Sequence, residues 1–270
     1  MDPTGRVALV TGAARGIGAA TVVALAADGW SVLAVDLAAE GAISVPYALA
    51  TEADLAAVVT EAAGIAGDAS RVAAFPADVR SAGALQTAVA DAESRWGGLD
   101  AAIGCAGVIA GGLRQWEVPT EQEQAVLDVD LVGVLNLARA SVPALLRRPE
   151  PRSGRFLAVA SAAATRGLPM LAAYCAAKAG VAGLIRALAA ELGPTGVTAN
   201  AVSPGSTATA MLDESARLYG LTGPADFARS QPAGRLLEPA EIAAVLVFLA
   251  RPRSGAMTGA VIPVDGGLAL

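Results

Sequence analysis

The sequence contains no histidine, the side chain that most often carries protons near neutral pH. Any acid–base chemistry must therefore use another group. There are two cysteines, Cys105 and Cys175, and their separation matches neither a metal site nor a disulfide framework. We expect both to be small apolar core residues, and we predict no metal site.

Aromatic and charged residues are also few, at 4% and 16% of the 270 residues, while 54% are hydrophobic. This composition excludes a disordered chain and requires a core built from alanine, valine, leucine and isoleucine. No stretch approaches the roughly 20 uninterrupted apolar residues that a membrane-spanning helix needs. The start, MDPTGRVALVTG, passes directly into a strand-like run, which predicts no signal or transit segment.

The 25 acidic residues outnumber the 19 basic residues, and the net charge is −6. Nucleic acids and anionic membranes attract basic proteins, so neither is expected to be the main partner. We therefore expect a cytoplasmic protein that acts on a small molecule.

Short apolar runs alternate with longer alanine-rich segments of helical spacing. The runs predict strands at 6–10, 31–35, 71–75, 99–103, 155–160, 197–202 and 260–264. The longer segments predict helices at Ile17–Asp28, Ala82–Trp96, Glu121–Leu146, Ala172–Leu192 and Pro239–Ala250. This alternation indicates an α/β fold with βαβ units: one Rossmann-type domain over 1–270, in which a doubly wound parallel sheet of about seven strands carries helices on both faces.

Two connections are longer than a crossover requires. Residues 37–70 include Pro46 and a short helix for which Thr51 is the predicted N-cap. Residues 205–238 are rich in glycine, serine and proline. A long irregular segment in a compact domain is usually a lid or a binding loop, so we interpret 205–238 as a substrate lid.

A glycine-rich turn, LVTGAARGIGAAT, joins the first strand to the first helix. Gly12, Gly16 and Gly18 provide the tight turn and close backbone approach that a dinucleotide phosphate needs at a helix N-terminus. Asp36 follows the second strand, where a carboxylate accepts hydrogen bonds from the ribose hydroxyls and repels a 2′-phosphate, which favours NAD over NADP. Arg15 lies in the turn and could instead favour a phosphate, or lie beside the pyrophosphate.

The order of motifs resembles the short-chain dehydrogenase/reductase family over essentially the whole chain. The T-G-x-x-x-G-x-G turn is followed by Ser161 and, thirteen residues later, by Tyr174-x-x-x-Lys178. The resemblance implies that Tyr174 is the general acid/base, that Ser161 hydrogen-bonds the substrate oxygen, and that Lys178 holds the nicotinamide ribose. It thus implies an NAD-dependent enzyme that interconverts a secondary alcohol and a ketone.

Other family motifs extend the implied cofactor site. Asp78 and Val79 resemble an adenine contact, Thr207 in the SPGSTATAM turn resembles a carboxamide contact, and VDGG at 264–267 resembles the family's closing segment. The implied cofactor-binding residues are Gly12, Arg15, Gly16, Ile17, Gly18, Asp36, Asp78, Val79, Cys105, Ala106, Gly107, Tyr174, Lys178, Pro204, Gly205 and Thr207.

Physical chemistry supports the implied pair, because positions i and i+4 share one helix face. An adjacent ammonium and the positive charge of an oxidised nicotinamide lower a tyrosine pKa from its usual value of about 10. Two departures from the family pattern stand out: GCAG at 104–107 in place of Asn-Asn-Ala-Gly, and Asp130 in place of the asparagine of a proton relay. Asp130 is expected to pair with Lys178 and to weaken its effect on Tyr174. Asn136 lies six residues away and faces elsewhere.

The predicted lid carries apolar side chains, which suggest an apolar substrate of small to medium size. They include Met211, Leu212, Leu218 and Tyr219. The same side chains could instead pack against the core or a neighbouring subunit. Members of the family usually form dimers or tetramers, and the same is expected here.

The connection SVPYALATEADL resembles a subgroup of the family that is associated with the redox carrier mycofactocin and is thought to retain NAD. An extra helix beside the adenosine half could cover the cofactor and slow its release, although an insertion at the surface costs little. Two other functions stay open at this point: an NADPH-dependent 3-oxoacyl or polyketide-type ketoreductase, and a non-catalytic nucleotide-binding regulator.

Overall fold

A computed structural model describes residues 5–37 and 43–270 of the chain. Its centre is a parallel sheet with the strand order β3-β2-β1-β4-β5-β6-β7. All neighbouring strands run parallel. The strands are β1 (Val7–Thr11), β2 (Ser31–Asp36), β3 (Val72–Pro76), β4 (Ala101–Gly104), β5 (Arg155–Val159), β6 (Thr198–Pro204) and β7 (Val261–Val264).

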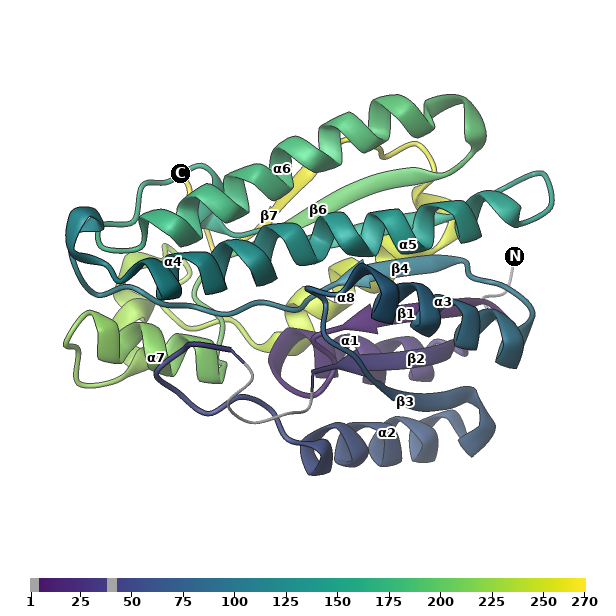
Figure 1. The fold of residues 1–270 in the computed structure, drawn as a ribbon, viewed down its shortest axis with the longest axis horizontal. Coiled ribbons are helices and arrows are strands. Elements are labelled where there is room, and N and C mark those ends of the chain that lie inside the picture. Colours follow the sequence, from purple (N-terminus) through teal and green to yellow (C-terminus); the bar gives the residue numbers. More distant parts are fainter. Residues whose placement is uncertain (1–4, 38–42) are drawn as a thin grey trace.

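Helices cover both faces of the sheet (Figure 1). One face carries α1 (Gly16–Ala27), α2 (Glu52–Ala66) and α8 (Pro239–Ala250), and the other carries α3 (Ala82–Trp96), α4 (Thr120–Leu127), α5 (Gly133–Arg147) and α6 (Ala172–Leu192). A shorter helix, α7 (Ala210–Leu218), lies in the predicted lid. The predicted doubly wound α/β fold is confirmed.

Successive side chains of one strand enter opposite cores, as a sheet buried on both faces requires. In β1, Val7 and Leu9 belong to the core beneath α3–α6, whereas Ala8 and Val10 belong to the core beneath α1, α2 and α8. The fully apolar runs in the sequence are explained by this two-sided burial. Proline is tolerated at position 263 because β7 lies at a sheet edge, where one side of the strand has no ladder to complete.

The predicted helix over 121–146 is interrupted in the structure. A π-helical turn, Asp128–Val132, separates α4 from α5. Hydrophobic periodicity cannot detect one widened turn, because the apolar face continues on either side of it. The turn carries the buried Asp130.

The connection after β2 has two described parts. Residues 43–50, here called the strap, form an irregular segment with bends at 43, 46 and 47 that leads into α2. The predicted cap is confirmed: Thr51 accepts a hydrogen bond from the Asp54 N–H, and the Asp54 carboxylate accepts one from the Thr51 N–H, which forms a capping box. Residues 38–42 of the predicted insertion lie outside the described residues.

Two helical stretches, 120–147 and 172–195, are long and apolar enough to cross a bilayer by length and composition alone. In this fold both stretches pack against the sheet. Core helices of globular proteins also meet this criterion of length and composition. The first of them is also the stretch that the π-helical turn divides.

Candidate active site

The order in which successive strands are added to the sheet reverses between β1 and β4, and a large cavity opens at the carboxyl ends of these strands. Ligands of open α/β sheets bind at this switch point. The cavity has a volume of about 740 Å³, and segments that follow all seven strands line it. Every residue predicted to bind the cofactor lines this one cavity.

The glycine turn packs closely against the loop that follows β4. Gly12 has φ +68°, and a Cβ there would lie 2.5 Å from the Ala106 nitrogen. A Cβ on Gly18 would lie 1.9 Å from the Gly12 oxygen. The helix α1 that follows has no side-chain cap at its N-terminus, unlike α2, α3 and α7. The turn therefore leaves a backbone cradle at a positive helix end, which suits a dinucleotide phosphate.

Asp36 ends β2 and directs one carboxylate oxygen to the Ala14 N–H at 2.9 Å. It thus lies beside the glycine turn, as an acid that selects a ribose should. Arg15 turns toward the connection after β2. It pairs with Asp54 at 2.7 Å and donates to the Ala48 carbonyl at 3.5 Å, so it links the glycine turn to the strap.

The remaining predicted cofactor contacts lie along the same wall. Asp78 is held by Arg80 at 2.7 Å, and Asn136 donates to the carbonyls of Val79 and Arg80 at 3.0 Å each. Asn136 thus stabilises the 78–80 turn and faces away from Lys178, in agreement with its helical offset. Burial raises the pKa of Cys105 to about 12, so this thiol stays protonated.

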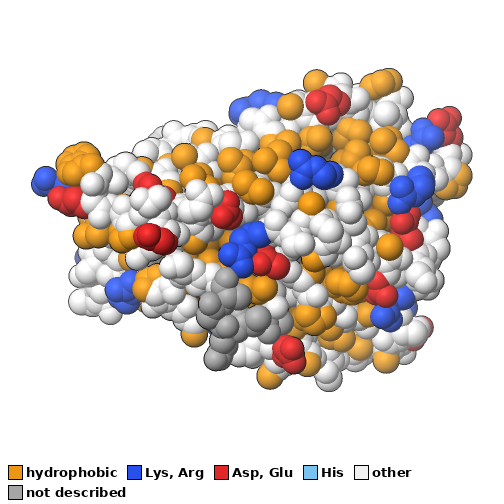
Figure 2. All heavy atoms as spheres, viewed as in Figure 1, with side chains coloured by type: hydrophobic (Ala, Val, Ile, Leu, Met, Phe, Trp, Pro, Cys, Tyr) orange, Lys and Arg blue, Asp and Glu red, His pale blue; other side chains and the backbone are white. Residues whose placement is uncertain are grey.

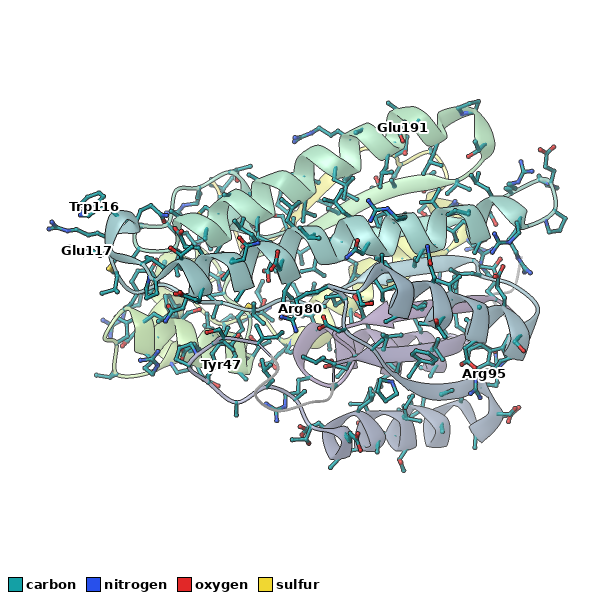
Figure 3. The ribbon with its side chains drawn as sticks, in the orientation of Figure 1. Tyr47, Arg80, Arg95, Trp116, Glu117 and Glu191 are labelled. Carbon is teal, nitrogen blue, oxygen red and sulfur yellow. The ribbon has the colours of Figure 1, made fainter. Side chains whose placement is uncertain are left out.

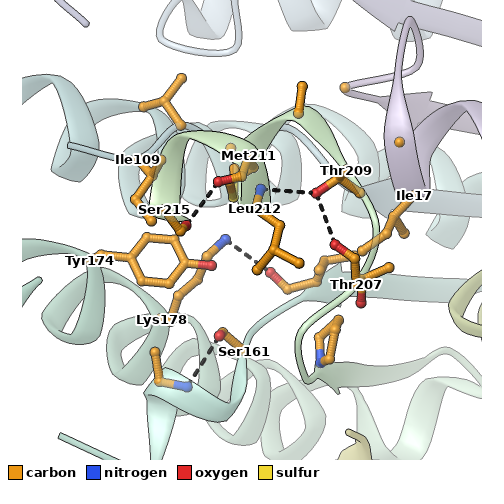
Figure 4. A pocket seen from close by; sticks show the side chains of 18 of the residues that line it. Ile17, Ile109, Ser161, Tyr174, Lys178, Thr207, Thr209, Met211, Leu212 and Ser215 are labelled. Carbon is orange, nitrogen blue, oxygen red and sulfur yellow. Dashed lines mark hydrogen bonds between the residues drawn. The ribbon is translucent and has the colours of Figure 1, made fainter. Parts of the chain in front are cut away.

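Tyr174, Lys178 and Ser161 are brought together at one wall of the cavity (Figure 4). Tyr174 and Lys178 lie one turn apart on α6, with the lysine Nζ 5.5 Å from the centre of the tyrosine ring. Ser161 follows β5, and its hydroxyl accepts the Ala163 N–H at 3.1 Å. Tyr174 and Lys178 are both buried within the fold.

The electrostatic balance at Tyr174 differs from the sequence-based expectation. Burial raises its pKa, Lys178 lowers it, Asp130 raises it, and a hydrogen bond with Ser161 lowers it. The net direction is upward, because desolvation of a phenolate outweighs the attraction of an ammonium that is already paired. The expected effect of Lys178 is present, but the protein alone does not bring the Tyr174 pKa below its ordinary value.

Asp130 lies behind the cavity wall and forms a buried ion pair with Lys178 at 3.1 Å. Its other oxygen accepts the Val108 N–H at 2.7 Å, and Lys178 also donates to the Val159 carbonyl at 3.2 Å. Burial raises the pKa of Asp130, while Lys178 opposes the shift. For Lys178, burial lowers the pKa, whereas the charge of Asp130, together with smaller contributions, raises it by more than burial lowers it. The net shift of the Lys178 pKa is therefore upward. The lysine therefore stays an ammonium.

The predicted lid contributes three of its four singled-out residues to the cavity. Met211, Leu212 and Tyr219 line it, whereas Leu218 packs beside Gly112 and the core. The Tyr219 hydroxyl donates to the Pro169 carbonyl at 2.8 Å, and its ring meets Phe227 edge-on with 6.1 Å between centroids. This part of the cavity is therefore mostly apolar.

Sequence reasoning missed several cavity residues. Tyr47 and Leu49 reach the cavity from the strap, and Leu168 and Leu171 reach it from the loop after β5. No motif marks these positions. The one available signal is the alternation of apolar residues at 43, 45, 47 and 49, which is typical of an extended segment with one buried side.

The fold and the site together define a nucleotide-binding α/β protein of the Rossmann type, whose cavity joins a phosphate cradle to a buried Tyr–Lys pair. A model of the family described as "Enoyl-(Acyl carrier protein) reductase" matches residues 12–269. The chain belongs to the short-chain dehydrogenase/reductase family, whose members are oxidoreductases.

Three relatives illustrate its neighbourhood. The short-chain reductase protein NovJ of Streptomyces niveus is 40% identical over 97% of this chain and 93% of its own length. The cyclohexanol dehydrogenase of Rhodococcus sp. strain TK6 is 38% identical over 98% of this chain and 96% of its own. The crystal structure of a carveol dehydrogenase from Mycobacterium avium in complex with NAD superposes with a TM-score of 0.90 at 31% identity, covering 99% and 98% of the two chains.

Proposed function

We propose that this protein is an NAD-dependent dehydrogenase that interconverts an apolar, ring-containing secondary alcohol and its ketone. The observation that carries this proposal is the shared cavity, in which a dinucleotide cradle adjoins Ser161, Tyr174 and Lys178. NAD is favoured over NADP because Asp36 lies beside the glycine turn.

The residues present fit the cofactor. Gly12 and Gly18 have no room for a Cβ, so the turn packs closely against the protein backbone, and the uncapped N-terminus of α1 that lines the cavity supplies positive charge. Asp36 would hold the adenosine ribose, Asp78 and Val79 would contact the adenine, and Thr207 would contact the carboxamide. Bound NAD supplies the hydride acceptor.

The chain's own residues provide the proton chemistry. Tyr174 takes the hydroxyl proton of the alcohol, or returns it to the ketone in reduction, and Ser161 hydrogen-bonds the same oxygen. Lys178 stabilises the Tyr174 phenolate and would also hold a ribose hydroxyl. In the protein alone, the net shift of the Tyr174 pKa is upward, so proton removal depends on the additional positive charge of the oxidised nicotinamide. Asp130 is a positioning residue that holds the lysine in place.

The substrate end of the cavity favours a compact apolar molecule. Leu171, Met211, Tyr219 and Phe227 line this end, and apolar walls select ligands largely by shape. The names of two relatives, cyclohexanol dehydrogenase and carveol dehydrogenase, refer to alcohols with a hydrocarbon ring. We therefore expect alicyclic secondary alcohols to be substrates.

Steady-state kinetics with a panel of cycloalkanols test this function. NADH should form with NAD and cyclohexanol, NADP should support much less turnover, and linear diols should be poorer substrates. Preference for NADP together with turnover of acyl thioesters would instead support a ketoreductase. Nucleotide binding without turnover of any alcohol or ketone would support a regulator.

We further propose that the strap slows the release of NAD, as expected for the mycofactocin-associated subgroup. Ile43, Tyr47, Ala48, Leu49 and Ala50 line the cavity, and Arg15 ties the strap and α2 to the glycine turn. Mass spectrometry of the denatured protein after gel filtration should find NAD in stoichiometric amount. Loss of nucleotide during gel filtration would contradict retention and the need for a redox carrier such as mycofactocin.

We propose that the protein forms a homo-oligomer and acts in the cytoplasm. Hydrophobic side chains gather over α5 and α6 in Figure 2, and Val132 and Leu135 are 38% and 37% exposed there. We expect this face to be covered in a homodimer or homotetramer, and light scattering of the purified protein would determine the number of subunits. Cell fractionation should find the protein in the cytoplasm.

A further inference from the structure

The strap has one half-buried side although it pairs with no strand over its described residues. Its odd-numbered side chains pack against the core and its even-numbered ones face solvent through position 48. The inward side chains are those of Ile43, Val45, Tyr47 and Leu49. Three of these four also line the cavity, and Val45 does not.

Tyr47 reaches from the strap to the loop after β4. Its hydroxyl accepts a hydrogen bond from the Ile109 N–H at 3.0 Å. In Figure 3 it lies close to α7, away from the body of α2. Ile109 is labelled near Ser215 and Tyr174 in Figure 4, and Tyr47, Ile109 and Tyr174 all line the cavity. Tyr174 also acts electrostatically on Tyr47, so Tyr47 is anchored on the side of the cavity that carries Tyr174.

The anchor point also joins the catalytic wall. The N–H of Val108 donates to Asp130, and Asp130 pairs with Lys178. Two consecutive backbone N–H groups thus bind two different side chains. The Val108 N–H binds the Asp130 carboxylate, and the Ile109 N–H binds the Tyr47 hydroxyl. The second hydrogen bond fixes the Tyr47 hydroxyl to the loop after β4.

Tyr47 is suited to a steric role and not to proton transfer. Its hydroxyl is occupied by the Ile109 N–H. Burial raises its pKa, the Ile109 hydrogen bond lowers it, and the negative charges of Asp130 and Glu214 raise it, with a net upward direction. A phenol that stays neutral, with its polar atom engaged, presents an apolar ring surface to the cavity.

We propose that Tyr47 is a specificity-determining residue, which together with Met211 and Tyr219 of the lid segment limits the size of the alcohol that reaches Tyr174. This inference rests on the proposed alcohol dehydrogenase function. The strap follows the NAD-selecting strand, yet through Tyr47 it also forms part of the substrate wall. Rings that exceed the space between strap and lid must displace the Tyr47 side chain and break its hydrogen bond to Ile109.

Kinetics of Tyr47→Ala and Tyr47→Trp with cyclopentanol, cyclohexanol, cyclooctanol and cyclododecanol test the proposal. The alanine variant should raise kcat/KM for cyclododecanol relative to cyclohexanol by about tenfold or more, as expected when an apolar pocket gains room. The tryptophan variant should shift preference toward cyclopentanol, which keeps the proposal testable if the alanine variant does not fold. Val45→Ala is the matched control, with an unchanged ring preference.

The dissociation constant of NAD, measured in parallel by calorimetry on nucleotide-free protein, separates this role from cofactor retention. In both Tyr47 variants, the fold-change in this dissociation constant should be smaller than the fold-change in the ratio of kcat/KM values for the large and small rings. Equal changes for all four alcohols, or weaker NAD binding with an unchanged ring preference, would overturn the inference while leaving the dehydrogenase intact. Wild-type protein that oxidises none of the alcohols would instead refute the proposed function and, with it, this inference.

Discussion

Tyr174 is the residue on which the proposed proton transfer depends. Replacing it with phenylalanine removes the hydroxyl and leaves the buried ring, so the fold and the NAD cradle should persist. We expect kcat for cyclohexanol oxidation to fall about 10²- to 10⁴-fold, the usual contribution of a positioned acid or base. Tyr219→Phe is the matched control, because it removes a hydroxyl from the lid and should lower kcat far less. Comparable rates for Tyr174→Phe and the parent would remove Tyr174 from the mechanism.

The buried charge of Asp130 acts on the ionisation of the buried Tyr174 hydroxyl. Tyr174 is faced by Lys178 on the same helix, by Ser161 after β5, by Asp130 on the π-helical turn and, farther off, by Tyr47 of the strap. The negative charge of Asp130 raises the Tyr174 pKa. Asp130→Asn removes this charge, so the pKa of Tyr174 should fall and the acid limb of kcat/KM for alcohol oxidation should move to lower pH.

Glu214→Gln makes the same chemical change on α7, where Glu214 pairs with Arg217 at 2.6 Å, and the limb should stay in place. Asp130→Ala should also cost about 3 kcal/mol or more of unfolding free energy, since it leaves the Lys178 ammonium buried without its partner. Denaturant titration measures this cost. An acid limb that does not move in Asp130→Asn would mean that Asp130 exerts no electrostatic effect on Tyr174.

At the scale of elements, Arg15 is the contact through which the glycine turn holds the strap and α2. The Arg15 and Asp54 side chains are 40% and 33% exposed, and an exposed ion pair contributes at most about 1 kcal/mol to stability. Arg15→Ala should therefore change the unfolding midpoint little. It should accelerate NAD release, measured by exchange with labelled NAD, because the strap loses its tie to the cradle. An unchanged exchange rate would show that the link between Arg15 and the strap does not control NAD release.

Element boundaries show what sequence periodicity can and cannot predict. The ranges Ala82–Trp96, Ala172–Leu192 and Pro239–Ala250 were predictable because apolar spacing and flanking turns agree there, and the first and third helices also begin at a capping side chain. The π-helical turn was not predictable, since one extra residue in a turn leaves the pattern on both sides intact. The pairing of Asp130 with Lys178 was expected from charge alone, but the backbone N–H of Val108 that holds the carboxylate is visible only in the fold.

At the scale of the whole molecule, the order of motifs was sufficient to predict the seven-stranded sheet and those cavity residues that belong to a motif. Each cofactor motif follows a strand, and the carboxyl ends of parallel strands meet at one edge. The strap was missed as part of the site because its contacts are long-range. Tyr47 meets Ile109 across 62 residues of sequence, and neither residue belongs to a motif.

The preference for NAD over NADP should be measurable as a difference in how much each nucleotide raises the Tm of the whole domain. A ligand that binds only the folded state at 100 times its dissociation constant stabilises it by about 2.7 kcal/mol, which corresponds to a rise of roughly 5–10 °C in Tm for a domain of this size. For protein stripped of nucleotide, NAD should produce this rise, and NADP at the same concentration should produce less, because the Asp36 carboxylate repels a 2′-phosphate. Asp36→Asn keeps an acceptor for the Ala14 N–H but removes the charge, so the two nucleotides should then stabilise more equally. Equal rises with NAD and NADP in the parent protein would mean that Asp36 does not face the ribose, and that another residue of the cavity selects the cofactor.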